Sequence, residues 1–252
     1  RIEEPVLGVA LDGVGFGTDG GAWGGELLRV DGADWHRVAH LVTLPLPGGD
    51  CAAREPWRLA AAALHRLGRG QEIAERFARE PAAARLAQIL ERGVCCPPTS
   101  SAGRVFDAAA ALLGVAERSR FEAQAAMRLE ALARRGVARD IERLWNYDSQ
   151  DNLDVLPLLE AIADWHGRVE DGAALFHASF AAALADWIVR SAVDVGCVAL
   201  CGGCLANGLL RDALGRHLGE AGLRVLHPIA LPPNDGAISV GQAWAAIVAA
   251  EV

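Results

Sequence analysis

Hydrophobic and polar residues alternate with a period of two near the start of the chain. The alternation covers residues 6–43 and is interrupted by a glycine-rich turn and by a second turn at Asp31–Gly32, so it predicts β-hairpins. From about residue 55 to residue 135, apolar residues recur every three or four positions in long Ala/Leu/Arg stretches. This pattern predicts helices with a break at 95–101. We expect a strand at 142–147 and further helices over 154–165 and 172–191.

The last sixty residues change pattern again. Short apolar runs at 196–201 and 223–227 alternate with helical periodicity at 207–221 and 236–250. A β-α-β-α order of this kind is typical of an α/β nucleotide-binding lobe. We therefore predict the α/β class.

Composition and charge restrict the classes of partner that this chain is expected to bind. The chain has 252 residues, of which 52% are hydrophobic, and a formal net charge of −8, which fits one sizeable core or two lobes sharing one. No run of 18 or more apolar residues occurs, so we expect no membrane partner. The acidic balance without a Lys/Arg stripe argues against nucleic acid. Six cysteines in this length favour reduced thiols and a cytoplasmic location.

Three cysteines have a spacing that iron–sulfur clusters use. Cys197, Cys201 and Cys204 form a C-x3-C-x2-C pattern within "GCVALCGGCLANGLL". The first two belong to a predicted strand, and four steps along a strand separate two backbones by about 13 Å. Cluster ligands must converge within a few ångströms, so we interpret these cysteines as small hydrophobic residues.

The glycines in the same stretch suggest a different chemistry. Gly202 and Gly203 lie between a strand and a helix, and Asn207 lies at the helix start. Glycines allow a ligand to approach the backbone closely, and a helix N-terminus offers free N–H groups. The pattern fits nucleotide binding or, equally, a plain strand–helix turn that Asn207 caps.

Three aspartates have a functional and a structural interpretation each. Asp12 begins a glycine-rich hairpin, "ALDGVGFGTDGGAWGGE", which either wraps a phosphate or acyl group or only makes turns. Asp107 lies in an apolar helix and needs either a ribose hydroxyl or Arg104 as partner. Asp235 is either a helix cap or a metal ligand.

Two histidines have HxxxH spacing but a strand pattern around them. His36 and His40 would form a metal pair on a helix, whereas on a strand their rings stand apart. We therefore expect no metal pair from them.

Ordered segments along the whole chain resemble one family. The segments are "LDGVGFGTDGGAWGGE", "RVAHLVTLPLPGGD", "EPWR", "TSSAGRVFDAAAALLGV", "FEAQAAM", "CGGCLANGLL" and "LPPNDGAISVGQAW". Together they resemble the C-terminal carbamoyltransferase domain of the nickel–iron-hydrogenase maturation carbamoyltransferase. That family is related to tRNA threonylcarbamoyl-adenosine synthases and antibiotic O-carbamoyltransferases. The resemblance implies an actin-like ATPase (ribonuclease H-like) architecture, with mixed sheets flanked by helices.

The resemblance also implies a reaction and its partners. Upstream domains of such an enzyme make carbamoyl-adenylate from carbamoyl phosphate and ATP. The domain resembled here moves the carbamoyl group to the C-terminal cysteine of a nitrile-forming maturation protein. That partner then forms the nitrile that supplies cyanide ligands to the hydrogenase iron.

By position, the resemblance assigns roles to individual residues. Asp12 and Asp235 are implied in catalysis, and Asp235 is also the implied ligand of a divalent metal (Fe, Zn or Mg). The residues implied to bind the adenylate are Gly13, Val14, Gly15, Asp107, Glu122, Gly202, Gly203 and Asn207.

The chain also departs from the family pattern. The family's HxxxH metal ligands lie just upstream of the strand with which this chain begins, and Ala123 replaces a usual glycine. We therefore expect residues 1–252 to be a fragment with an incomplete first lobe. It would lack the acylphosphatase-like, zinc-finger and carbamoyl-adenylate-forming domains, and would be inactive alone. Two alternatives remain. One is an O-carbamoyltransferase acting on a small-molecule hydroxyl, and the other is a non-catalytic nucleotide-binding or partner-docking module.

Overall fold

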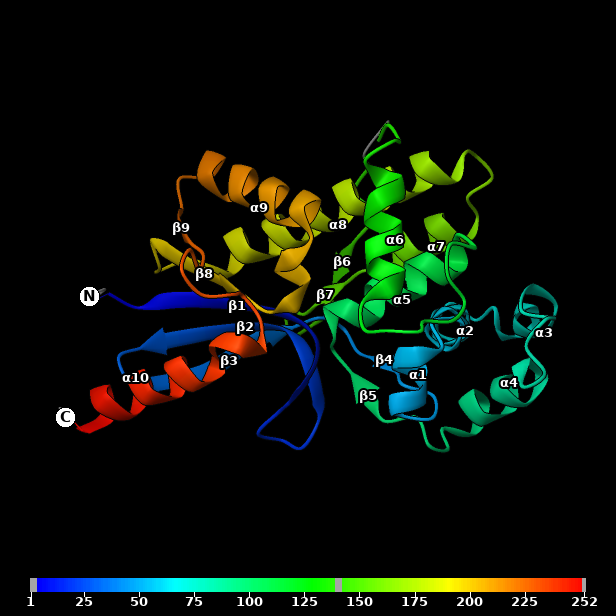
Figure 1. The fold of residues 1–252 in the computed structure, drawn as a ribbon, viewed down its shortest axis with the longest axis horizontal. Coiled ribbons are helices and arrows are strands. Elements are labelled where there is room, and N and C mark those ends of the chain that lie inside the picture. Colours follow the sequence, from blue (N-terminus) through cyan, green and yellow to red (C-terminus); the bar gives the residue numbers. More distant parts are fainter. Residues whose placement is uncertain (1–3, 139–141, 251–252) are drawn as a thin grey trace.

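The fold is a mixed β-sheet with helices on both sides (Figure 1). The computed structural model describes residues 4–138 and 142–250. The strands are β1 (Val6–Phe16), β2 (Ala22–Asp31), β3 (Asp34–His40), β4 (Leu44–Pro45), β5 (Pro98–Thr99), β6 (Asn146–Tyr147), β7 (Leu153–Asp154), β8 (Cys197–Cys201) and β9 (Arg224–Leu226). The α-helices are α1 (Asp50–Arg54), α2 (Trp57–Arg66), α3 (Ile73–Arg76), α4 (Ala83–Arg92), α5 (Ala102–Leu112), α6 (Gln124–Ala133), α7 (Leu156–Ala163), α8 (Val169–Ser191), α9 (Gly208–Glu220) and α10 (Ile238–Ala250). Short 3₁₀ helices are η1 (Gly70–Glu72), η2 (Gly203–Ala206) and η3 (Asp235–Ala237).

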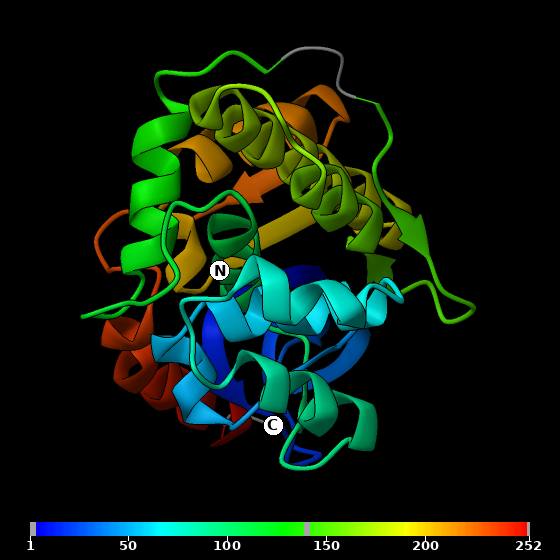
Figure 2. The ribbon, with the colours of Figure 1, turned by 90° about the vertical axis from the view of Figure 1, so that its right-hand side faces the viewer.

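The large sheet joins the two ends of the chain. Its strand order within the described residues is β4-β5-β2-β1-β8-β9. Strand β3 lies outside this order and also pairs with β2. β1 is antiparallel to β2 and parallel to β8, which in turn is parallel to β9. Helices α8 and α9 lie together on one side of these strands and α10 lies on the other, whereas α1 to α4 gather at one end (Figures 1 and 2). The N-terminal hairpin therefore lies directly beside the C-terminal β-α-β unit.

The pairing of β1 with β2 is irregular at the predicted site. Leu11 pairs with Gly25 and Gly15 pairs with Trp23, so three residues of β1 oppose the single residue Gly24 of β2. Such a bulge bends a strand and redirects its side chains. The bulge places Asp12 at the bend.

Burial explains the apolar sequences of helices α5 and α8. α5 has an Ala-rich sequence that lets it pack closely, and it contacts both α2 and β1. α8 is long and apolar enough to cross a membrane by length and composition alone, but 78% of its apolar window is buried inside the protein. Its apolar character therefore reflects its place in the core, between α6 and α9.

Most of the predicted elements are confirmed. The hairpins, the helices between 55 and 135, and the final strand–helix–strand–helix order all appear at the expected places. The strand predicted at 142–147 is wrong in extent, because only Asn146 and Tyr147 pair, and they pair with β7. Residues Glu142 to Trp145 form no strand hydrogen bonds. The Trp145 indole N–H instead donates to the Asp186 carboxylate at 2.9 Å.

Helix α10 differs from the other helices in its packing. Its residues are almost entirely apolar, yet Ile238, Val240, Trp244 and Ile247 are all exposed, Trp244 to 59%. Its main contacts are with η3 just before it. α10 therefore adds little apolar burial to the core of the described residues.

Candidate functional site

Three glycines from separate elements lie against the backbone around Asp12. A methyl group on Gly24 of β2 would lie 2.6 Å from the Asp12 carbonyl oxygen, and one on Gly103 of α5 would lie 2.7 Å from the Gly13 Cα. A methyl group on Gly202, after β8, would lie 2.1 Å from the Leu11 carbonyl oxygen. No side chain fits at these distances. The β1 bulge is thus enclosed by backbone from three separate parts of the chain.

Ser101 fastens the start of α5 to this bulge. Its hydroxyl donates to the Asp12 carbonyl oxygen at 2.8 Å and accepts from the Arg104 backbone N–H at 3.2 Å. The second contact makes Ser101 the N-cap of α5. One hydroxyl therefore both caps the helix and fixes its position relative to Asp12.

The side chain of Asp12 stays close to the turn after β8. Its Oδ1 accepts from the Gly13 N–H at 2.7 Å. A methyl group on Gly203 would lie 3.1 Å from the same oxygen and 3.9 Å from the Asn234 Cβ. The structure thus brings Asp12, Gly202 and Gly203 together.

Asp107 lies one turn into α5 and is almost fully buried. Burial raises the pKa of its carboxyl to about 6, although the charge on Arg104 acts in the opposite direction. Its Oδ2 lies 2.9 Å from an Arg104 Nη2, but the two atoms are not aligned as a hydrogen bond, and Oδ2 has no hydrogen-bond partner among the described residues. The predicted pairing with Arg104 is present but leaves this oxygen, and the Arg104 Nε, without a hydrogen bond.

Asn207 begins α9 and is held by a buried histidine. Its Oδ1 accepts from the Leu210 N–H at 3.1 Å, which makes it the N-cap of the helix. Its Nδ2 lies 3.0 Å from the Nε2 of His177 on α8. The Nδ1 of His177 lies 2.8 Å from the Ala173 carbonyl oxygen. Burial lowers the pKa of His177, with the Ala173 contact opposing the shift. The ring is therefore neutral, donates from Nδ1 and accepts from Asn207 through Nε2.

A carboxylate of α6 also contacts the start of α9. Glu130 Oε1 accepts from the Gly208 N–H at 3.0 Å and from Arg134 at 2.6 Å. A carboxylate is favourable there because the first N–H groups of a helix lack partners within it. Helices α6, α8 and α9 are thus joined at one point.

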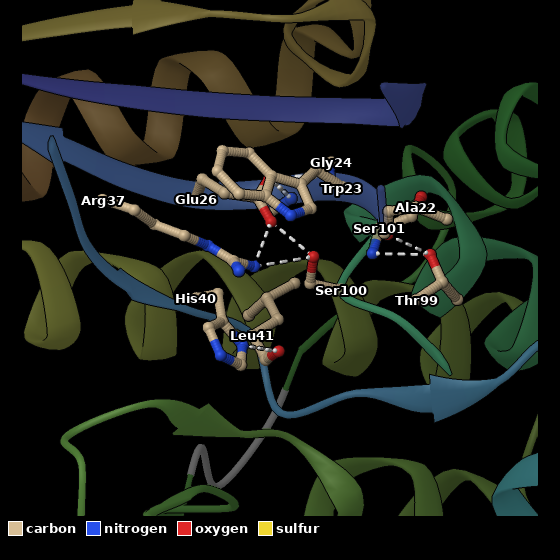
Figure 3. Close-up of polar contacts among 12 residues, drawn as sticks. Ala22, Trp23, Gly24, Glu26, Arg37, His40, Leu41, Thr99, Ser100 and Ser101 are labelled. Atoms are coloured by element: carbon tan, nitrogen blue, oxygen red, sulfur yellow. Dashed lines mark hydrogen bonds and ion pairs between the residues drawn. The ribbon is translucent and has the colours of Figure 1, made fainter. Parts of the chain in front are cut away.

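Glu26 is the centre of a buried polar cluster beneath the hairpin (Figure 3). Its Oε2 accepts from the N–H groups of Gly24 and Gly25, both at 2.6 Å. Its Oε1 accepts from Arg37 at 2.9 Å and from the Ser100 hydroxyl. The cluster therefore fixes the glycine that opposes the β1 bulge.

Four of the predicted residues lie outside this contact group. Val14 and Gly15 are exposed beyond the bulge, and Glu122 is exposed without a hydrogen bond or ion pair inside 4–138 and 142–250. Asp235 is exposed at the start of η3, where Asn234, not Asp235, is the cap. The interpretation of Asp235 as a helix cap is therefore wrong.

The described part of the chain holds no group of three or more His, Cys, Asp or Glu side chains that could bind a metal ion. His36 and His40 lie on β3, so they form no helical HxxxH pair. Cys197 and Cys201 belong to β8, as expected, and Cys204 follows in η2. Burial, together with the charge on Asp12, raises the pKa of Cys204 to about 12, so its thiol stays protonated. The residues described here do not by themselves form a metal site.

Sequence reasoning missed the supporting residues. None of His177, Glu26 and Glu130 is assigned a role from the sequence. The signal in each case was a polar side chain at a position that the local period assigns to the interior, such as His177 within "ALFHASF".

Comparisons with known proteins identify the family of this chain. The family described as carbamoyltransferase, Kae1-like domain, second subdomain, matches residues 8–242. The chain belongs to this family. Relatives include carbamoyltransferase HypF2 of Cupriavidus necator, 47% identical over 97% of this chain and 34% of the relative. Carbamoyltransferase HypF of Rhizobium leguminosarum bv. viciae is 44% identical over 96% of this chain and 32% of the relative.

Solved structures of the family share the fold. Full-length HypF in a phosphate- and nucleotide-bound form has a TM-score of 0.84 and 31% identity, over 97% of this chain and 33% of that one. HypF of T. kodakarensis has the same TM-score and 32% identity, over 98% of this chain and 34% of that one. These neighbours confirm the actin-like, ribonuclease H-like class. The chain spans about a third of the length of these relatives.

Proposed function

We propose that this chain binds the nucleotide part of carbamoyl-adenylate and transfers its carbamoyl group to the C-terminal cysteine of a nitrile-forming maturation protein. The observation that carries the proposal is the close approach of Gly24, Gly103 and Gly202 to the backbone of Leu11, Asp12 and Gly13. Glycines, which have no Cβ, let a phosphate or acyl phosphate approach the backbone closely.

The residues around the convergence fit a nucleoside. The Asp107 Oδ2 atom is buried without a hydrogen-bond partner among the described residues, and a ribose hydroxyl is a suitable donor for it. Asn207 follows the Gly202–Gly203 turn at the start of α9, where the resemblance places the nucleotide. Membership in the carbamoyltransferase family supports the same assignment.

The proposed reaction exchanges an oxygen for a sulfur at the carbamoyl carbon. The acceptor thiol loses its proton and attacks that carbon, a C–S bond forms, the bond from carbon to the phosphate oxygen breaks, and AMP leaves. In this proposal Asp12 and Gly13 hold the carbamoyl end, while Asp107 and Asn207 hold the nucleoside. We also propose a cytoplasmic location, because the acceptor must remain a free thiol.

A divalent metal enters the proposal only through Asp235. The resemblance makes this aspartate one ligand of Fe, Zn or Mg, and its exposed carboxylate is accessible for that role. The other ligands would come from outside residues 1–252. No step of the reaction above depends on that metal.

Calorimetric titration with ADP and Mg²⁺ tests the nucleotide part of the proposal. The matched variants are Asn207→Ala, which removes both the cap and the amide, and Asn207→Ser, which keeps a capping oxygen. We expect saturable binding that both substitutions weaken. Absence of binding to a folded sample would count against a nucleotide site within this chain.

A transfer assay tests the acceptor. Carbamoyl-adenylate formed in place by the upstream domains of a relative is offered to a peptide ending in cysteine and, separately, to sugar alcohols. Carbamoylation of the peptide supports the proposal, whereas carbamoylation of the alcohols favours an O-carbamoyltransferase. Nucleotide binding without either product favours a docking module.

A further inference from the structure

A hollow lies away from the residues around Asp12. It has a volume of about 600 Å³ and lies between the end of α1, the loop after α5 and the first turns of α6. Its lining residues are Arg54, Glu55, Arg118, Ser119, Arg120, Gln124 and Arg128. None of the residues assigned to the nucleotide lines it. On α6, Gln124 and Arg128 lie one turn apart on one face, whereas Glu130, which contacts α9, projects from a different face.

The charge of this hollow is opposite to that of the chain. Four arginines and one glutamate line it, which leaves an excess of three positive charges in a protein of net charge −8. Arg118 pairs with Glu55 and Glu80. Arg54, Arg120 and Arg128 form no ion pair with any residue in 4–138 or 142–250. A hollow lined by one sign of charge concentrates ions of the other sign.

Backbone contacts hold the hollow in shape. The Ser119 N–H donates to the Arg54 carbonyl oxygen at 2.8 Å, which ties the loop to α1. The Arg120 N–H donates to the Gln124 Oε1 at 2.7 Å, which ties the loop to α6. The Ser119 hydroxyl oxygen is buried and has no hydrogen-bond partner within the described residues. A site prearranged in this way loses less conformational freedom when a ligand binds.

We propose that this hollow is a binding site for a small phosphate-bearing molecule. Guanidinium groups are suited to phosphate and carboxylate oxygens, which they bind in pairs. One carboxylate has only two oxygens in one plane and satisfies a single arginine. Arginines that approach from α1, the loop and α6 suit a tetrahedral group with oxygens in several directions.

Titration of the protein with inorganic pyrophosphate at low ionic strength tests this site. The pocket variant is Arg120→Gln with Arg128→Gln. The control is Arg85→Gln with Arg92→Gln, which makes the same change of charge at exposed positions of α4. We expect saturable binding whose Kd rises at least about tenfold in the pocket variant and less than about threefold in the control. Lack of saturable binding, or equal losses in the two variants, would overturn the proposal.

Two further titrations separate this site from the nucleotide site and identify the source of the phosphate. Asn207→Ala should leave pyrophosphate binding unchanged, and a loss there would place pyrophosphate at the nucleotide site and overturn the proposal. Titrations with inorganic phosphate and with ADP on the Asn207→Ala background then show whether a free phosphate or a nucleotide phosphate is preferred.

Discussion

The Nε2 atom of His177 accepts from the side-chain amide of Asn207 at 3.0 Å, and this contact determines how Asn207 is oriented. The Ala173 carbonyl requires a proton on Nδ1, and the Leu210 N–H requires the Asn207 oxygen to face it. Neither ring nor amide can therefore turn over without losing a hydrogen bond. A core histidine and the cap of α9 thus act as one unit.

His177→Ala should weaken ADP binding about three- to tenfold, because a net hydrogen bond contributes about 1 kcal/mol. His177→Gln keeps an acceptor oxygen near the position of Nε2 and should stay within about twofold of the parent protein. Calorimetry on both variants measures the effect. Equal losses in the two would show that His177 acts by packing alone.

Asp107 should impose a pH dependence on stability. Its pKa is raised by burial from 3.8 to about 6, so the folded protein binds this proton more tightly than the unfolded chain. Its contribution to stability is therefore fully present below pH 3.8 and is lost as the pH rises through about 6. Asp107→Asn removes that dependence. Urea unfolding should show the stability of the variant relative to the parent increasing by about 2 kcal/mol between pH 4 and pH 7.

The same variant separates folding from binding. Asp107→Asn should also weaken ADP binding, because an amide presents only one acceptor to the ribose. A stability difference that stays constant across the pH range would mean that Asp107 titrates normally.

Glu26 should contribute more to stability than an exposed carboxylate. It satisfies the N–H groups of Gly24 and Gly25 and pairs with Arg37, whose side chain also lies over the Trp23 ring (Figure 3). Glu26→Gln replaces one acceptor oxygen by a donor and removes the buried negative charge that pairs with Arg37. We expect a loss of about 2 kcal/mol in the free energy of unfolding. A loss below about 0.5 kcal/mol, measured by urea unfolding, would contradict a structural role for the cluster.

Two glycines after β8 should respond to the same substitution in opposite ways. Gly202 has a φ of 104° and lies against Leu11, so Gly202→Ala should be strongly destabilising or prevent folding. Gly215, inside α9, has open space around it, and Gly215→Ala should stabilise the helix by up to about 1 kcal/mol. Thermal unfolding of the two variants measures the contrast. Similar melting temperatures would mean that Gly202 does not approach Leu11.

The elements of this protein could be predicted from its sequence because periodicity is a local property. The alternation at 6–43 and the helical period at 207–221 depend only on which side of each segment is buried. The glycine-rich hairpin that Asp12 begins and the Gly202–Gly203 pair could be recognised for the same reason, because each interrupts a periodic segment. The strand predicted at 142–147 was wrong in extent because most of its apolar residues lie in a loop, from which they pack against the core without pairing with another strand.

Only the tertiary structure decided which of these residues meet. Gly24, Gly103 and Gly202 are far apart in the chain. The pairing of β1 with β2 and β8, and the packing of α5 against β1, bring them to the same bulge. The partners of Asn207 and Glu26, and the arginines around the hollow, likewise come from separate elements. Contacts of this kind depend on how whole elements pack on one another, which no local pattern specifies.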